Sequence, residues 1–167
     1  MNRKKKPLIT VIFGTRPEAI KLSPLIKKLK NCNFTRTRVV ITGQHQEMVN
    51  QVMKVFDIRE DLNLRLMKDG QTLTHITNAS LKGLELEFIS NRPDMVIVQG
   101  DTTTAFSAAL AAFYKKIPVA HVEAGLRTNN LFNSYPEEAN RRLISQIATL
   151  HFAPTKLAAD NLRSNGI

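Results

Sequence analysis

Short apolar runs alternate with amphipathic segments along almost the whole chain, and this alternation limits the fold more than any other feature. We interpret the apolar runs as buried strands, at residues 8–13, 39–41, 95–98, 119–122 and 150–152. Strands that are apolar throughout belong to parallel sheets covered on both faces. Separated by helices, they predict a doubly wound, Rossmann-like α/β fold.

The amphipathic segments between the strands are the predicted helices. Helical spacing of apolar residues predicts helices after Pro17 and over 49–56, 71–91, 105–113, 136–148 and 154–164. Residues 57–70 are mixed and polar and are predicted to form a loop. The 167 residues suit one domain. In doubly wound sheets ligands bind beyond the carboxyl ends of the strands, so function is sought in the turns that follow them.

Composition excludes several classes of protein. A single cysteine, Cys32, excludes an internal disulfide and a cysteine-rich zinc site, and the four histidines lack metal-ligand spacing, so we expect no metal. No apolar stretch approaches the roughly 20 residues that span a bilayer, and we expect a cytoplasmic protein that does not enter the membrane. The net charge of +10 leaves nucleic-acid binding as a less favoured alternative. The basic residues form only short clusters without interleaved aromatics, so we expect no nucleic-acid partner.

The first strand ends in a turn that carries positive charge. Gly14 and Thr15 are followed by Arg16 and Pro17, and Lys21 lies one turn further along. Free backbone N–H groups at a helix start form an anion site, and Arg16, preceding a proline, is predicted to be extended and to point away from the helix. The alternative is an ordinary helix start with Arg16 in solvent. The turn lacks the G-x-G-x-x-G pattern of dinucleotide sites.

Three carboxylates follow successive later strands. Asp101 has an ordinary explanation as a helix N-cap, and Glu137 as an acidic residue in a first helical turn. Glu123 has neither, because a loop of about ten residues follows it. Together with the cations of the first turn they favour general acid/base chemistry on an anionic substrate. Binding of Mg²⁺ with a phosphate remains a less favoured alternative, since no D-x-D motif occurs.

Six motifs stand in an order that is typical of a known family. They are G-T-R-P-E-A-I-K (14–21), T-G-Q-H (42–45), Q-G-D-T-T-T (99–104), H-V-E-A-G-L-R-T (121–128), P-E-E-A-N-R (136–141) and H-F-A-P-T (151–155). With these motifs the chain resembles the N-terminal half of the non-hydrolysing UDP-N-acetylglucosamine 2-epimerases over essentially all its length.

The resemblance implies a domain organisation and an activity. It implies that residues 1–167 are the N-terminal Rossmann-like domain of a GT-B-like enzyme, with a C-terminal UDP-binding domain absent from this chain. Such an enzyme interconverts UDP-GlcNAc and UDP-ManNAc by elimination and re-addition of UDP, without a cofactor, and supplies ManNAc for cell-surface polysaccharide. We expect the isolated chain to be inactive, because only one wall of the interdomain cleft is present.

The resemblance also assigns roles to residues. It implies that Asp101, Glu123 and Glu137 are catalytic carboxylates that a nearby arginine, Arg141, supports, while Arg16 and Lys21 contact the substrate phosphates. Which carboxylate serves which face of C2 stays open. Repulsion between neighbouring carboxylates is expected to raise the pKa of at least one of them.

A second, activating UDP-GlcNAc site of many bacterial members is only partly kept. Gln44 and His45 match it, but Glu47 replaces a glutamine and Gly70 an arginine. An added carboxylate and a lost guanidinium both weaken diphosphate binding, so activation there is in doubt.

The resemblance also implies a homodimer, and the long helix predicted over 71–91 offers Leu73, Ile76, Leu84 and Phe88 for its interface.

The alternative function is a nucleotide-sugar-binding half-domain of a GT-B glycosyltransferase. Glu123 together with Glu137 distinguishes the two, since binding alone does not need them.

Overall fold

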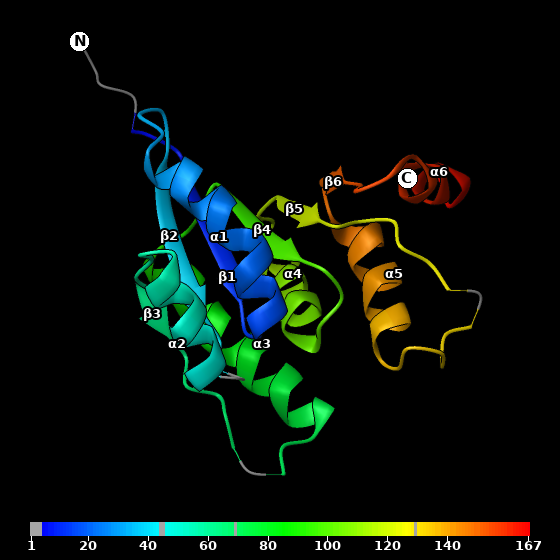
Figure 1. Cartoon of the computed structure of the whole chain (residues 1–167), viewed down its shortest axis with the longest axis horizontal. Coiled ribbons are helices and arrows are strands. Elements are labelled where there is room, and N and C mark those ends of the chain that lie inside the picture. The colour runs from blue at the N-terminus through cyan, green and yellow to red at the C-terminus, as the bar shows by residue number, and fades with distance from the viewer. Residues whose placement is uncertain (1–4, 44–45, 69, 129) are drawn as a thin grey trace.

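The computed structural model describes residues 5–43, 46–68, 70–128 and 130–167, and in these ranges the chain forms a parallel sheet (Figure 1). The six strands lie in the order β3-β2-β1-β4-β5-β6. Their bounds are β1 (Leu8–Phe13), β2 (Arg36–Ile41), β3 (Leu62–Asn63), β4 (Met95–Gln99), β5 (Val119–Val122) and β6 (Leu150–Phe152). Every pairing between neighbours is parallel, so the carboxyl ends of all strands meet at one edge.

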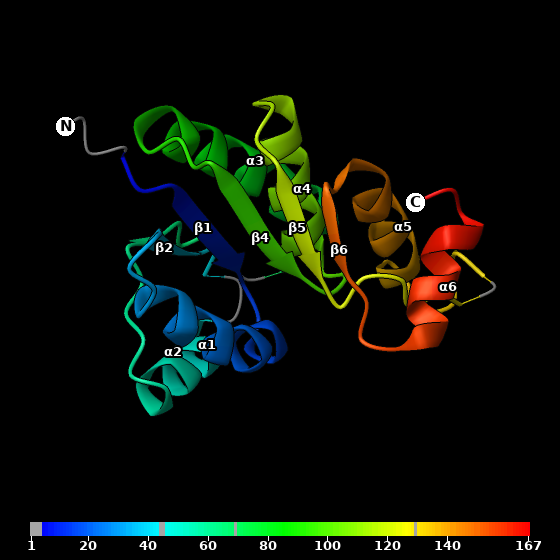
Figure 2. The ribbon, with the colours of Figure 1, turned by 90° about the horizontal axis from the view of Figure 1, so that it is seen from above.

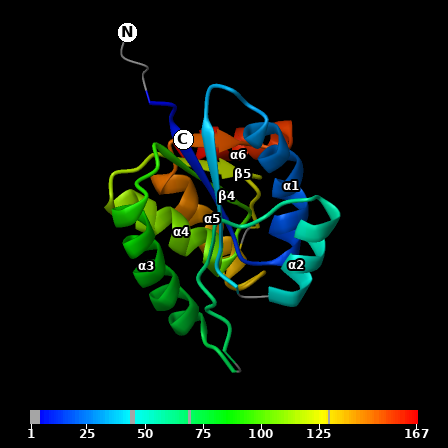
Figure 3. The ribbon, with the colours of Figure 1, turned by 90° about the vertical axis from the view of Figure 1, so that its left-hand side faces the viewer.

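Helices cover both faces of this sheet (Figures 2 and 3). They are α1 (Arg16–Lys30), α2 (Gln46–Val55), α3 (Leu73–Ser90), α4 (Thr103–Tyr114), α5 (Glu137–Ile147) and α6 (Lys156–Ser164). Helices α1 and α2 lie on one face, and α3, α4 and α5 lie on the other (Figure 3). The doubly wound α/β prediction is therefore confirmed. Within the described residues, no helix is both long and apolar enough to cross a membrane.

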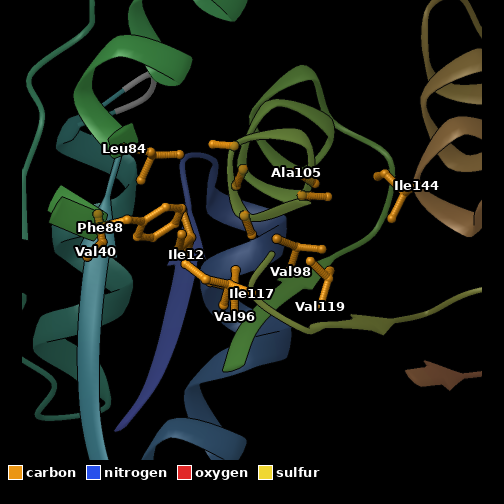
Figure 4. Packing of buried hydrophobic residues seen from close by; sticks show 14 residues of the cluster. Ile12, Val40, Leu84, Phe88, Val96, Val98, Ala105, Ile117, Val119 and Ile144 are labelled. Atoms are coloured by element: carbon orange, nitrogen blue, oxygen red, sulfur yellow. The ribbon is translucent and has the colours of Figure 1, made fainter. Parts of the chain in front are cut away.

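Two apolar clusters hold the helices to the sheet. Under α3, α4 and α5 the buried side chains include Ile12, Leu84 and Phe88, and Phe88 points toward Ile12 (Figure 4). Under α1 and α2 they include Leu22 and Ile26. Full burial of one such side chain stabilises the fold by about 1.5–3 kcal/mol. The strand ends are thus held on a rigid frame.

Two strand predictions differ from the structure. β3 has only two residues, too few for any periodicity to be visible, and it lies inside the predicted loop. β2 starts at Arg36 rather than at residue 39, because its first half is polar. Arg38 is tolerated there because its guanidinium forms an ion pair with the buried carboxylate of Glu87 on α3.

The apolar residues that we expected to serve dimerisation are mostly in the core. Leu84 and Phe88 are buried in the cluster under α3, α4 and α5, and Ile76 is buried as well, so that expectation was wrong for these three. The large apolar residues of α3 that the fold leaves exposed are Leu86, Ile89 and, to a smaller extent, Leu73. More of α3 is buried than helical spacing alone indicated, because α3 packs along α4 as well as against the sheet.

Candidate active site

The turn between β1 and α1 is built around a buried glutamate. Glu18 accepts hydrogen bonds from the backbone N–H groups of Gly14 at 3.1 Å and Thr15 at 2.7 Å, and from the Thr102 hydroxyl at 2.8 Å. Burial raises the pKa of Glu18, and these hydrogen bonds oppose the rise. The N–H groups that we predicted to bind an anion therefore already have a carboxylate partner.

Arg16 is the first residue of α1, with Thr15 as N-cap, so the predicted extended conformation is wrong. The Glu18 carboxylate binds the N–H groups of Gly14 and Thr15. The helix therefore begins at Arg16, one residue earlier than Pro17 indicated. Arg16 and Lys21 are exposed, and with Ile20 and Met48 they line a hollow of about 420 Å³. An anion at this turn would meet side-chain cations rather than backbone amides.

Glu123 follows β5 directly and has a backbone φ of +66°, which is unusual for a residue with a side chain. Hydrogen bonds on both sides fix this conformation, from Gly100 N–H to the Val122 carbonyl at 2.9 Å and from Ala124 N–H to the Phe152 carbonyl at 3.1 Å. A backbone held in this region costs about 1–3 kcal/mol, and such residues cluster at functional sites. This backbone conformation sets the direction of the Glu123 side chain at the carboxyl end of β5.

The Glu123 carboxylate has two partners. The Lys21 ammonium lies 2.8 Å from Oε1 and 2.7 Å from Oε2, and the Gln99 amide donates to Oε2. Lys21 therefore binds a carboxylate of the chain itself, which the sequence did not predict.

Asp101 is held at the end of β4. The N-cap of α4 is Thr102, whose hydroxyl accepts from Ala105 N–H at 2.9 Å, so capping does not explain Asp101. Its carboxylate lies 2.7 Å from the Arg141 guanidinium, and its backbone carbonyl accepts from the Asn140 amide at 2.9 Å.

The pKa of Asp101 lies above its ordinary value. Burial is the main cause, the Arg141 guanidinium opposes it, and the negative charges of Glu137 and Glu123 raise it further. The expectation that one carboxylate in the group has a raised pKa is confirmed. Its principal cause is desolvation rather than repulsion.

Glu137 and Glu138 begin α5 and have different environments. Glu137 is partly buried and near enough to Asp101 for their charges to interact. Glu138 is completely buried, accepts from Thr128 N–H at 2.9 Å and forms ion pairs with Arg141 at 3.3 Å and Arg142 at 2.6 Å. Glu138 therefore fixes the arginine that contacts Asp101.

His121 lies under these turns, completely buried in β5. Its Nε2 lies 2.7 Å from the carbonyl oxygen of Gly100, so Nε2 carries the proton and donates. Burial is the main reason that the pKa of His121 falls to about 4, against the opposing effect of the Gly100 hydrogen bond. His121 is therefore a core residue, and its hydrogen bond to Gly100 supports the turn that carries Asp101.

We expect His121 to destabilise this chain as the pH falls from 6.5 to 4. An unfolded histidine takes up its proton near pH 6.5, whereas His121 does so only near pH 4, so its contribution is complete above pH 6.5 and disappears as the pH falls to 4. The loss in the free energy of unfolding amounts to about 3 kcal/mol.

Urea denaturation of the wild type and of His121→Gln across this pH range would show the difference. The raised pKa values of Glu18 and Asp101 act in the opposite direction in both proteins and cancel in the comparison. Parallel curves for the two proteins would contradict the prediction.

The structure thus brings most of the predicted residues to one edge of the sheet. Lys21 is paired with Glu123, and Arg141 with Asp101. The charges of Glu123 and Glu137 both act on Asp101, which connects the five residues into one group. Gln99, Glu18 and Asn140 belong to it as well and were missed, although all three lie inside the motifs quoted above. In the ranges described, no group of three or more His, Cys, Asp or Glu side chains is arranged to hold a metal ion.

Of the predicted activating UDP-GlcNAc site, the structure describes only part. Gln44 and His45 lie outside the described residues. Glu47 lies on α2 and lines a separate hollow of about 250 Å³ with Gln46, Met48 and Met67. Met48 also lines the hollow beside Arg16, so the two hollows adjoin.

Comparison with known proteins gives consistent results. A sequence profile described as UDP-N-acetylglucosamine 2-epimerase matches residues 27–167. A Thermotoga maritima relative that bears this family name is 53% identical over 156 residues, which are 93% of this chain and 41% of the relative.

Solved structures agree with this relationship. The Neisseria meningitidis UDP-GlcNAc 2-epimerase bound to UDP-GlcNAc superimposes with a TM-score of 0.93 at 50% identity, over 96% of this chain and 43% of that one. The Methanocaldococcus jannaschii UDP-GlcNAc 2-epimerase in complex with UDP-GlcNAc and UDP has a TM-score of 0.90 at 39% identity, over 96% and 44%. This chain therefore spans less than half the length of each of these proteins.

Proposed function

Because the chain belongs to the UDP-N-acetylglucosamine 2-epimerase family, we propose that it is the N-terminal Rossmann-like domain of a two-domain enzyme that interconverts UDP-GlcNAc and UDP-ManNAc. We propose that a C-terminal domain binds the UDP moiety and closes the site. The observation that carries this proposal is the pair of carboxylates, Asp101 and Glu123, each with its own cation at one edge of the sheet.

The chemistry needs this arrangement. A base removes the proton from C2, the electron pair of the C2–H bond forms the C1–C2 double bond, and the C1–O bond breaks with its electrons going to the diphosphate. The products are 2-acetamidoglucal and UDP. Re-addition of UDP at C1, with a proton delivered to the other face of C2, gives the epimer. The C2 proton is barely acidic, so a positioned base is needed, and an acid/base group must act on each face.

The residues divide this work between them. We propose that Asp101, Glu123 and Glu137 carry out the proton transfers and that Arg141 holds Asp101 in place. Arg16 and Lys21 meet the diphosphate, whose charge grows as UDP departs, so their contribution is greatest in the transition state.

Two further features complete the proposal. We propose that the enzyme is a homodimer and that the exposed Leu86 and Ile89 of α3 contribute to its interface, since exposed apolar residues on one helix are typical of such surfaces. We also propose that an activating UDP-GlcNAc at Gln44 and His45 binds weakly, because Glu47 adds a negative charge near the diphosphate.

We expect the full-length enzyme to form UDP-ManNAc from UDP-GlcNAc and this chain alone to form none. Without the opposite wall, water reaches the carboxylates and the substrate is not oriented, which forfeits much of the roughly 7–11 kcal/mol that positioning supplies. NMR detection of the product with both purified proteins tests this. A full-length protein that binds UDP-GlcNAc without converting it would favour the glycosyltransferase alternative, and turnover by this chain alone would contradict the need for a second domain.

A further inference from the structure

Gln99 is the last residue of β4 and lies beside Glu123, and its role is not explained by the proton transfers themselves. We infer that Gln99 is a positioning residue, which keeps the Glu123 carboxylate in place when Lys21 leaves it for the diphosphate of the substrate. This inference rests on the proposed function and adds a residue to its machinery.

The topology places the two side chains together. β4 and β5 are neighbours in the sheet, with Gln99 in register with Val122, so the residue after Val122 starts beside Gln99. The hydrogen bond from Gly100 N–H to the Val122 carbonyl continues the pairing beyond the strand ends. The Gln99 side chain donates to Oε2 of Glu123, and Gln99 as a whole is 3% exposed.

The two partners of Glu123 differ in how firmly they hold it. The Lys21 side chain is 48% exposed, and an ion pair near the surface is weakened by solvent, so a diphosphate with more negative charge competes for the ammonium. The buried Gln99 amide lies at the end of a paired strand and has no such freedom. When Lys21 turns to the diphosphate, Oε1 becomes free to take a proton while Gln99 still holds Oε2.

A neutral amide suits this role better than a second cation. A glutamate side chain has several rotatable bonds, so a base at this position needs a fixed partner to stay within reach of C2. A permanent positive charge would fix the carboxylate but would also lower its affinity for a proton. The Gln99 amide supplies the geometry without a full charge.

Replacement of Gln99 in the full-length enzyme tests this inference. Gln99→Met keeps the length and volume of the side chain and removes the amide, and Gln99→Leu is a second, independent replacement. We expect kcat to fall about 10²-fold in both, the effect of a small misplacement of a catalytic group, with KM unchanged. The matched control is Asn91→Leu, which removes an amide donor 3.4 Å from the ion-paired carboxylate of Glu87, and kcat should not change.

A double-mutant cycle separates positioning from general structural support. If Gln99 acts through Glu123, adding Gln99→Met to Glu123→Gln causes no further loss of kcat. A second full loss in the double variant, a rise in KM with kcat intact, or an equal loss in Asn91→Leu would each overturn the inference. If the wild type is active and Gln99→Met equals it, the inference alone fails. If the wild type forms no UDP-ManNAc, the proposed function fails and the inference falls with it.

Discussion

Glu123→Gln in the full-length enzyme is expected to lower kcat about 10²–10⁴-fold, the usual contribution of one general acid/base group. The substitution keeps the size of the side chain and its ability to form hydrogen bonds, but it removes the proton acceptor. KM should change little, because Glu123 acts at C2 rather than on the diphosphate. Steady-state kinetics of epimerisation in both directions provides the measurement.

The matched control is Glu85→Gln on α3. Glu85 forms a 2.7 Å ion pair with Lys115, as Glu123 does with Lys21, but this pair joins α3 to the C-terminus of α4 and does not follow the carboxyl end of a strand. Its substitution should leave kcat unchanged. A Glu123→Gln enzyme with kcat near the wild-type value would make Glu123 a structural residue.

Gly125→Ala is expected to destabilise this chain by roughly 3–5 kcal/mol, through backbone strain together with overpacking. Gly125 has a φ of +88°, and a Cβ added there would lie 2.1 Å from the carbonyl oxygen of Ala158 on α6. Backbone cannot yield as a flexible side chain does, so α6 would have to shift away from the loop that carries Glu123. Urea denaturation of the wild type and the variant measures the loss.

Gly70→Ala controls for the strain alone. Gly70 has a φ of +64°, and an added Cβ meets nothing within 4 Å. Its substitution is expected to cost about 1–2 kcal/mol. Equal losses in the two variants would show that the contact with α6 contributes nothing.

The sheet was predictable because its central strands are buried on both faces and are therefore mostly apolar. Residues 119–122 were placed without error for this reason. β3 and the start of β2 were not, since two residues show no period and Arg36 and Arg38 look like surface residues. Arg38 is acceptable in a strand only because Glu87 neutralises it from another helix.

The position of the site was predictable, but its contacts were not. Parallel strands bring Asp101 and Glu123 to the same edge of the sheet, and this follows from the sequence once the strands have been located. The partners of these groups are distant in sequence, as in the pair of Lys21 and Glu123, which are 102 positions apart. Gln99 carries no charge and no capping or metal-ligand pattern, so nothing in the sequence alone marks it as a neighbour of Glu123.

Exchange of the hydrogen at C2 tests the central claim most directly. The proposed route removes this proton in every turnover, so in D₂O the full-length enzyme should place deuterium at C2 of UDP-ManNAc as it forms, and Glu123→Gln should do so far more slowly. Proton NMR of the product gives both rates. Epimerisation that retains the original C2 hydrogen, or exchange by Glu123→Gln at the wild-type rate, would contradict the account.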